Sequence, residues 1–192
     1  MLKFVEVSIT KNKEKVVKQK PELGPGWIEN TVEISAPKEE LDAIHTIVSG
    51  PVHRFYNSYI LEKDQPKIYL NQTRKNALFS FHRIKPMPYE IQLTRDIFTF
   101  DGKNDIEQAW MEHRYGANHW YEWALANWGC KWEARDVQVD MYDDCIEYVF
   151  YTYDTPPYHI ADELDNISHI FGGLLSWSFN AVGDEGNLEF LV

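Results

Sequence analysis

Hydrophobic and polar residues alternate with two different periods along this chain, so strands and helices are both predicted. An alternating pattern rich in β-branched and aromatic residues, or a short apolar run between turn residues, indicates a strand. The segment Ala77–Ile84, for example, alternates Phe79 and Phe81 with smaller or polar residues until Pro86 interrupts it. On this basis strands are predicted at residues 27–35, 55–61, 67–70, 77–84, 137–141, 146–153, 175–179 and 188–192.

Helical periodicity occurs in four places. Apolar residues recur every three or four positions between Pro37 and Gly50, at 106–111, at 118–128, and from Pro156 to about Phe171. The last third of the chain therefore has the order strand, strand, helix, strand, strand. This order predicts an α+β fold, namely a ferredoxin-like antiparallel sheet with helices packed on one face.

The N-terminal residues differ from the rest in charge. Residues 1–20 contain six Lys and two Glu, and Val5, Val7 and Ile9 alternate before a polar turn. A break rich in Pro and Gly follows at 21–26. We therefore expect a basic N-terminal β-hairpin appendage at residues 1–26 and a main domain at residues 27–192.

The C-terminal third is strongly acidic. From Asp136 to Val192 there are twelve Asp and Glu and no Lys or Arg, within a chain of net charge −11. This charge disfavours DNA binding, because phosphate contacts need basic side chains. The acidic residues either form a solvated face or bind a basic surface of a partner protein. The candidate binding residues are Asp143, Asp144, Asp162 and Asp165.

Two features bear on localisation. No run of about 18 apolar residues occurs, and residues 1–10 lack the apolar core of a secretory signal, so no membrane association is expected. The chain has two cysteines, Cys130 and Cys145, which are too few for a disulfide framework. A reducing cytoplasm is the simplest interpretation, and a single disulfide is the alternative.

A tryptophan-rich stretch is the most distinctive motif. It comprises Trp120, Trp123, Asn127, Trp128, Gly129 and Trp132, called here the tryptophan box. Trp120, Trp123, Ala124 and Asn127 fall at i, i+3, i+4 and i+7, the spacing of one helix face, and Gly129 fits the position where a helix stops. The box either packs this helix end onto the sheet or, with Lys131 and Arg135, stacks a ligand.

Three kinds of chemistry can be weighed against these structural interpretations. A zinc site could combine His119 and Glu122, three residues apart on a helix, with His113 and Cys130. Acid–base hydrolysis could use Asp140 with the four acidic residues named above. RNA could stack on Tyr148, Phe150, Tyr151 and Tyr153. No nucleophile elbow or Gly-rich phosphate loop is present, and no cofactor or metal is expected.

Four segments together resemble one known family. They are the box sequence Asn127-Trp128-Gly129-Cys130-Lys131-Trp132, the strand start Trp27-Ile28-Glu29-Asn30, the run from Phe79 to Met87-Pro88, and Thr152-Tyr153-Asp154-Thr155-Pro156-Pro157. They resemble the YubB ferredoxin-like domain family, although Asp154 and Cys130 stand where that family usually has Trp and Thr. The resemblance covers residues 27–192. It implies a ferredoxin-like fold, a phage or plasmid origin and a bacterial cytoplasm, and it brings no catalytic residues.

These observations favour a non-enzymatic accessory protein of a mobile element. Its acidic surface would bind a basic host protein and, by imitating nucleic-acid charge, inhibit a host defence or nucleic-acid-binding factor. A metal-assisted or acid–base hydrolase and an RNA-binding module are the alternatives.

Overall fold

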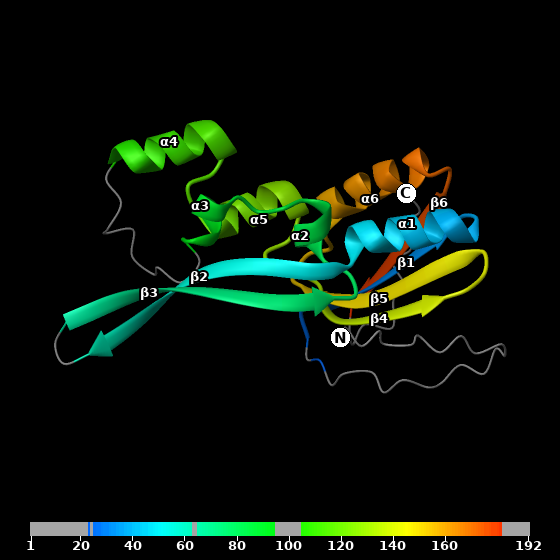
Figure 1. Ribbon diagram of the computed structural model, residues 1–192, viewed down its shortest axis with the longest axis horizontal. Helices are drawn as coiled ribbons and strands as arrows, with labels where there is room; N and C mark the ends of the chain where they lie inside the picture. The colour runs from blue at the N-terminus through cyan, green and yellow to red at the C-terminus, as the bar shows by residue number, and fades with distance from the viewer. Residues whose placement is uncertain (1–22, 24, 63–64, 95–104, 182–192) are drawn as a thin grey trace, which may run out of the picture.

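The computed structural model describes residue 23 and residues 25–62, 65–94 and 105–181, with the side chains of 53–75 outside this description (Figure 1). The predicted basic hairpin of residues 1–20 and the predicted strand 188–192 lie outside the described residues. None of the described helices is long and apolar enough to cross a membrane.

Four strands form one antiparallel sheet. They are β1 (Trp27–Ser35), β4 (Arg135–Met141), β5 (Cys145–Tyr153) and β6 (Leu174–Ala181), in the spatial order β4-β5-β1-β6. The central strand β1 pairs with β5 from Trp27↔Tyr153 to Ser35↔Cys145, and with β6 on its other side. The predicted α+β class is thereby confirmed, because helices accompany this antiparallel sheet.

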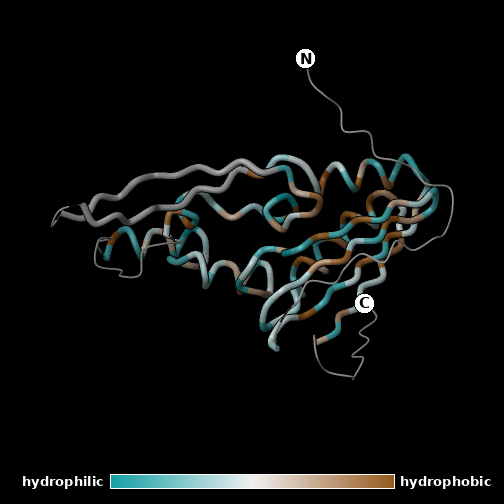
Figure 2. Tube along the Cα trace, turned by 90° about the horizontal axis from the view of Figure 1, so that it is seen from below, coloured by the Kyte–Doolittle hydropathy of each residue, from teal (hydrophilic) through white to brown (hydrophobic). Residues whose placement is uncertain are grey.

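Alternation along the strands gives the sheet two different faces. In β1, Val32 and Ile34 are fully buried whereas Glu33 between them is exposed. The same alternation puts Ile146, Tyr148 and Phe150 beside them across the register and leaves Glu147 on the other face. Figure 2 shows this as hydrophobic and hydrophilic colours that alternate along the strands.

Two helices cover the apolar face. Helix α1 (Lys38–Val48) begins after Pro37 and buries Leu41, Ile44 and Val48. Helix α6 (Tyr158–Ile170) begins after the Pro156-Pro157 pair and buries Ile160 and Leu164. Figure 1 shows both helices on the same side of the sheet, and their apolar residues belong to the same core cluster as Val32 and Trp177.

A long insertion lies between α1 and β4. It starts with a hairpin of β2 (Gly50–Glu62) and β3 (Gln65–Ala77), which is much longer than the two short extended segments predicted. In the described part of the insertion, four helices follow: α2 (Phe81–Ile84), α3 (Tyr89–Gln92), α4 (Asp105–Tyr115) and α5 (Trp120–Trp128).

The predicted strand at 77–84 is wrong beyond its first residue, because β3 ends at Ala77 and Phe81–Ile84 is a helix. The alternation of Phe79 and Phe81 misled the prediction, since both rings are buried, at 2% and 0% exposure. They pack against each other with centroids 6.1 Å apart and reach the sheet at Phe150. The helix start is satisfied by Glu133, a carboxylate about fifty residues downstream.

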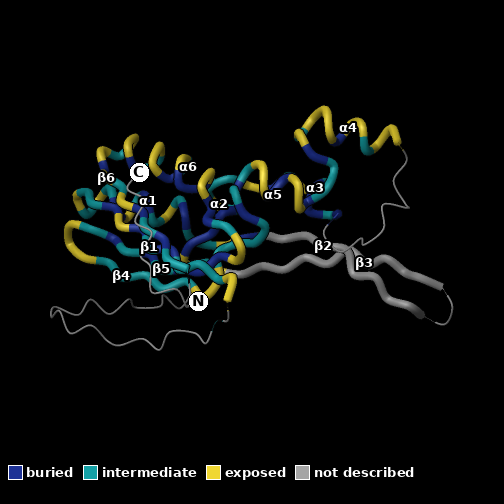
Figure 3. The backbone as a smooth tube through the Cα atoms, turned by 180° about the vertical axis from the view of Figure 1, so that it is seen from behind, coloured by how far each residue is buried: buried dark blue, intermediate teal, exposed yellow. Residues whose placement is uncertain are grey.

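Aromatic rings fill the space between sheet and helices. Phe79 lies 4.9 Å from both Tyr148 and Phe150, and Phe150 meets Trp177 edge-on at 5.7 Å. Asn30, fully buried among them, donates to Thr152 Oγ1 at 3.1 Å and accepts from Trp177 Nε1 at 3.4 Å. Figure 3 shows buried residues both on the sheet strands and on the helices that cover them.

Candidate functional site

The tryptophan box forms a packed helix end. Trp128, 2% exposed, meets Trp123 and Phe81 with centroids 5.7 and 5.8 Å away. Its indole Nε1 donates to the carbonyl of Lys85 at 2.9 Å, so the polar end of the ring is also satisfied. Asn127 donates to the carbonyl of Trp123 at 2.9 Å. Asn127 is only half-buried, so Trp128, and not Asn127, completes the buried face of this helix.

Gly129 lets the box approach the start of α6. Its φ is +81°, and a Cβ added there would lie 2.8 Å from the backbone nitrogen of Tyr158. Its carbonyl accepts a hydrogen bond from Thr155 Oγ1 at 3.1 Å. Only glycine combines this backbone conformation with this contact. The box and the Thr152–Pro157 turn, two segments that carry the family resemblance, are therefore in direct contact.

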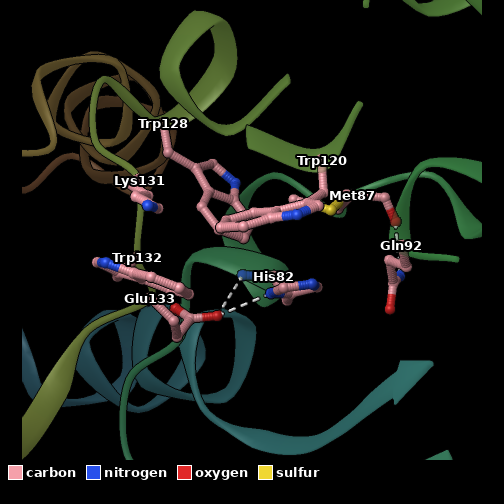
Figure 4. Close-up of a pocket in the computed structure, with 8 residues that line it drawn as sticks. All are labelled: His82, Met87, Gln92, Trp120, Trp128, Lys131, Trp132 and Glu133. Atoms are coloured by element: carbon pink, nitrogen blue, oxygen red, sulfur yellow. Dashed lines mark hydrogen bonds and ion pairs between the residues drawn. The ribbon is translucent and has the colours of Figure 1, made fainter. Parts of the chain in front are cut away.

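A small cavity lies beside the box (Figure 4). Its volume is about 20 Å³, which is room for roughly one water molecule. The residues that line it come from α2 to β4: His82, Met87, Gln92, Trp120, Trp128, Lys131, Trp132 and Glu133. Aromatic walls with a His–Glu pair have the composition of a ligand site, but this cavity is too small for a substrate.

The carboxylate of Glu133 is occupied by structural hydrogen bonds. It accepts from the backbone N–H of Phe81 and, at 3.4 Å, of His82, and from Ser80 Oγ at 3.2 Å. His82 Nδ1 lies 2.8 Å from the same side chain, as Figure 4 shows. With side-chain exposures of 7% for His82 and 11% for Glu133, this pair is a buried support for the start of α2.

Lys131 contacts the aromatic rings that the sequence suggested as a ligand-stacking site. Its ammonium lies 4.8 Å from the ring centroid of Trp132, 4.9 Å from that of Tyr121 and 5.7 Å from that of Trp120. These distances are in the range of cation–π attraction. The exposed side of the box therefore interacts with a cation of the chain itself.

The candidate zinc ligands are not brought together. Among the described residues, no three His, Cys, Asp or Glu side chains are placed to share an ion. His119 instead caps α5, where its ring nitrogen accepts from the N–H of Tyr121 at 3.3 Å. Cys130 is fully buried, donates to the carbonyl of Trp132, and has its pKa raised to about 12 by burial and the nearby Glu133. Cys130 and Cys145 are both thiols.

The four acidic binding candidates form two separate pairs. Asp143 and Asp144 are exposed in the turn between β4 and β5, at one edge of the sheet. Asp162 and Asp165 are exposed on the outer side of α6, which packs against β6 at the opposite edge. The two pairs therefore lie at opposite edges of the sheet.

The aromatic side chains of β5 also separate. Tyr148 and Phe150 are fully buried on the helix-covered face, and the phenol of Tyr148 is 2.9 Å from His45 Nδ1. Tyr151 is 2% exposed and donates to Glu29 Oε2 at 2.7 Å, while burial and this carboxylate raise the pKa of its phenol. Tyr153 alone of these four is exposed, at 42%. Base stacking on a sheet needs several exposed rings, which this strand does not supply.

The opposite face of the sheet carries a row of carboxylates. Glu33 on β1 lies directly across from Glu147 on β5, and Glu147 lies directly across from Asp140 on β4. Paired residues in antiparallel strands point to the same face with Cβ atoms about 5 Å apart. Three acidic side chains from residues far apart in the sequence therefore form one line, called here the acidic row.

The acidic row was missed because its members are isolated in the sequence. Each is a single acid between two inward apolar residues: Glu33 between Val32 and Ile34, Glu147 between Ile146 and Tyr148, and Asp140 between Val139 and Met141. That flanking pattern was the available signal. Charge density along the sequence selects adjacent acidic residues such as Asp143 and Asp144 instead.

This face of the sheet carries little positive charge. Among the residues of the four described sheet strands, Arg135 is the only Lys or Arg. Its guanidinium lies 5.1 Å from the ring centroid of Trp27 and 3.2 Å from a carboxylate oxygen of Asp136. No described helix packs on this side, since α1 and α6 lie on the other (Figure 1).

Comparisons of the chain with protein-family models, with curated proteins and with solved structures found no match.

Proposed function

We propose that this chain is a non-enzymatic accessory protein that binds a basic surface of a host protein through the helix-free face of its sheet. The acidic row of Glu33, Glu147 and Asp140 is the observation that carries this proposal. It gives three neighbouring carboxylates on one face of the sheet, a charge arrangement that is complementary to clustered Lys and Arg side chains.

Repulsion within the acidic row lowers the stability of the sheet, and a basic partner would reduce this repulsion. Like charges placed directly opposite on neighbouring strands destabilise a sheet by roughly 0.2–1 kcal/mol for each pair. Glu147 has such a neighbour on both sides. Cations of a partner would remove this repulsion, and the field of the row would speed their encounter at low ionic strength.

The strand order supports a ferredoxin-like core. Without the insertion, the chain runs β1-α1-β4-β5-α6-β6 with the spatial order β4-β5-β1-β6. This is the sequence of elements in a split βαβ arrangement, and both helices would then cover one face. In the proposal, residues 50–134 are an insertion into this core.

The resemblance to phage- and plasmid-encoded proteins suggests the kind of partner. A mobile element gains from a protein that acts in the bacterial cytoplasm on a host defence or nucleic-acid-binding factor. Such a factor has a basic surface that normally holds phosphates. The acidic row would occupy that surface and inhibit the factor by competition.

The test measures how two triple variants, each with three carboxylates replaced by amides, bind one purified basic partner obtained from the bacterial host. The triple variant Glu33→Gln, Glu147→Gln, Asp140→Asn removes the acidic row. The matched control, Asp143→Asn with Asp162→Asn and Asp165→Asn, removes the same number of charges elsewhere. We expect the first to weaken binding at least tenfold at low salt and the second less than threefold, since exposed single pairs contribute about 0–1 kcal/mol.

Salt provides an independent measure. Binding through the row should weaken as ionic strength rises toward physiological values, because Glu33 is exposed, Glu147 and Asp140 are half-buried, and salt screens charges at a surface. A partner that binds both variants and the parent chain equally, at all salt concentrations, would show that the acidic row is not the binding surface.

A further inference from the structure

The ammonium of Lys131 faces three aromatic rings instead of a carboxylate. Its nitrogen lies 4.8 Å from the ring centroid of Trp132, 4.9 Å from that of Tyr121 and 5.7 Å from that of Trp120. Within the part of the chain that the structure describes, this ammonium forms no ion pair with Asp or Glu. In a chain of net charge −11, a lysine that contacts rings and no acid indicates that these rings attract cations by themselves.

The three rings meet the cation in different planes. Trp120 and Tyr121 begin α5, and Trp132 follows the turn after that helix. The ring of Trp120 is inclined by 37° to that of Trp132 and by 68° to that of Tyr121. Several rings of different orientation around one ammonium are the arrangement of the aromatic cages that bind alkylated amines. Trp120, Tyr121 and Trp132 are called here the aromatic cage.

The small cavity beside the tryptophan box adjoins this cage. Trp120, Lys131 and Trp132 all line it, and Glu133 belongs to the same lining (Figure 4). Lys131 is only half-buried, and its flexible four-carbon stem lets the side chain turn out into solvent. The space that it leaves then adds to the cavity. A carboxylate in the lining favours a cation over a neutral group of the same size.

We propose that the aromatic cage is a binding site for an alkylammonium group, and that Lys131 is the built-in occupant that an external amine displaces. The external amine has the chemistry of a lysine side chain, either carried by a partner protein or present as a free small amine. The cage shares no residue with the acidic row, so this inference is independent of the proposed function.

Lys131 would act as a tethered competitor. It is the residue next to Trp132 in the chain, so its effective concentration at the cage is in the millimolar range or above. The parent chain should therefore bind an external amine more weakly than a chain without Lys131. Only cations offered at high local concentration, such as those of a basic surface, would displace it.

Titration of the full chain with n-butylammonium tests the site, with the indole N–H signals in ¹H–¹⁵N spectra as the readout. This probe reproduces the lysine side chain, and n-butanol is its neutral counterpart. Lys131→Ala should bind n-butylammonium at least threefold more tightly than the parent, and the indoles of Trp120 and Trp132 should shift most. n-Butanol should bind this variant at least threefold more weakly than the amine does.

Arg114→Ala is the matched control. The Arg114 guanidinium lies 5.6 Å from the ring centroids of both Trp110 and Tyr115, so this change also removes one cation from a group of rings. It should leave the n-butylammonium affinity measured at the cage indoles unchanged. In the Lys131→Ala chain, Tyr121→Leu should weaken that affinity at least threefold. Tyr121 is 40% exposed, so its replacement tests the cage without emptying the core.

A second probe distinguishes the two sources of the amine. Nα-acetyl-lysine methylamide carries the same ammonium on a peptide unit. Comparable binding of both probes assigns the cage to lysine side chains of a partner, whereas binding of n-butylammonium alone assigns it to free amines. No gain in amine affinity in Lys131→Ala, or equal affinity of that variant for n-butanol, would overturn the inference and leave the proposed function standing.

Discussion

The two faces of the sheet use the same strands for different purposes. On the helix-covered face, Val32, Tyr148 and Trp177 lie side by side across three strands and are at most 2% exposed. On the opposite face, one residue further along, Glu33 and Glu147 are paired without a described helix above them. Burial of apolar area stabilises the helix-covered face. The opposite face keeps its position because it is formed by the same strands. A binding surface can therefore vary in charge while the fold persists.

The largest expected effect is at the core of the tryptophan box. Trp128→Ala should reduce the free energy of unfolding by about 3–5 kcal/mol, because the buried indole and its hydrogen bond to Lys85 are lost. Denaturant titration measures it. Trp110→Ala is the matched control, since that ring is 47% exposed on α4. Equal midpoints for the two variants would mean that the box does not stabilise the fold.

Gly129→Ala should rank second, at roughly 2–4 kcal/mol, since it combines a left-handed backbone with a contact to the backbone of Tyr158. Gly116→Ala separates the two causes. Gly116 has a φ of +70° but nothing within 4 Å of its added Cβ, so only the conformational part, about 1 kcal/mol, applies. Thermal unfolding of both variants gives the difference. An equal loss of stability in the two variants would mean that the close approach of Gly129 to Tyr158 does not add to the cost of the substitution.

A smaller effect concerns pH on the covered face. Burial lowers the pKa of His45 below 6.5, with a further lowering by Lys38, partly offset by Asp42. The unfolded state then binds more protons near and below pH 6.5, so stability should fall as pH decreases through that window. His45→Gln should flatten this fall in urea titrations at several pH values. His159→Gln, half exposed on α6, is the matched substitution outside the core.

The smallest effect distinguishes the open face. Glu147→Gln removes two like-charge pairs and should stabilise the protein at low salt by roughly 0.2–1 kcal/mol for each pair. Added salt should abolish the gain, because exposed charges are screened. Glu163→Gln offers a contrast, since that carboxylate is 2.9 Å from Lys85 Nζ and its loss removes an attraction. A destabilised Glu147→Gln protein would contradict repulsion within the row.

Local sequence patterns predicted the helices and strands that do not depend on a distant residue. The alternation at 27–35 and the stripe of Leu41, Ile44 and Val48 correspond to β1 and α1. The failure at Phe81–Ile84 has a nonlocal cause, because Glu133 satisfies the start of that helix from the far side of the insertion. Sequence periodicity carries no information about such a partner.

The acidic row shows the same limit for the site. Which strands become neighbours, and in which register, depends on the whole sheet, so Glu33, Glu147 and Asp140 could not be grouped from their positions in the chain. Charge density along the sequence selected Asp143, Asp144, Asp162 and Asp165 instead. The total negative charge was readable from composition, and its arrangement on the surface was not.

The central position of β1 has a consequence for how the chain folds. Asn30 bonds to Thr152, which is 122 residues away, and accepts from Trp177 at a separation of 147. Strand β1 is therefore made on the ribosome well before the strands with which it pairs. Such high contact order slows folding, and at a synthesis rate of about 5–20 residues per second the wait lasts roughly 6–25 seconds. During that time β1 exposes its apolar residues, so a chain truncated before β5 is expected to aggregate or bind chaperones.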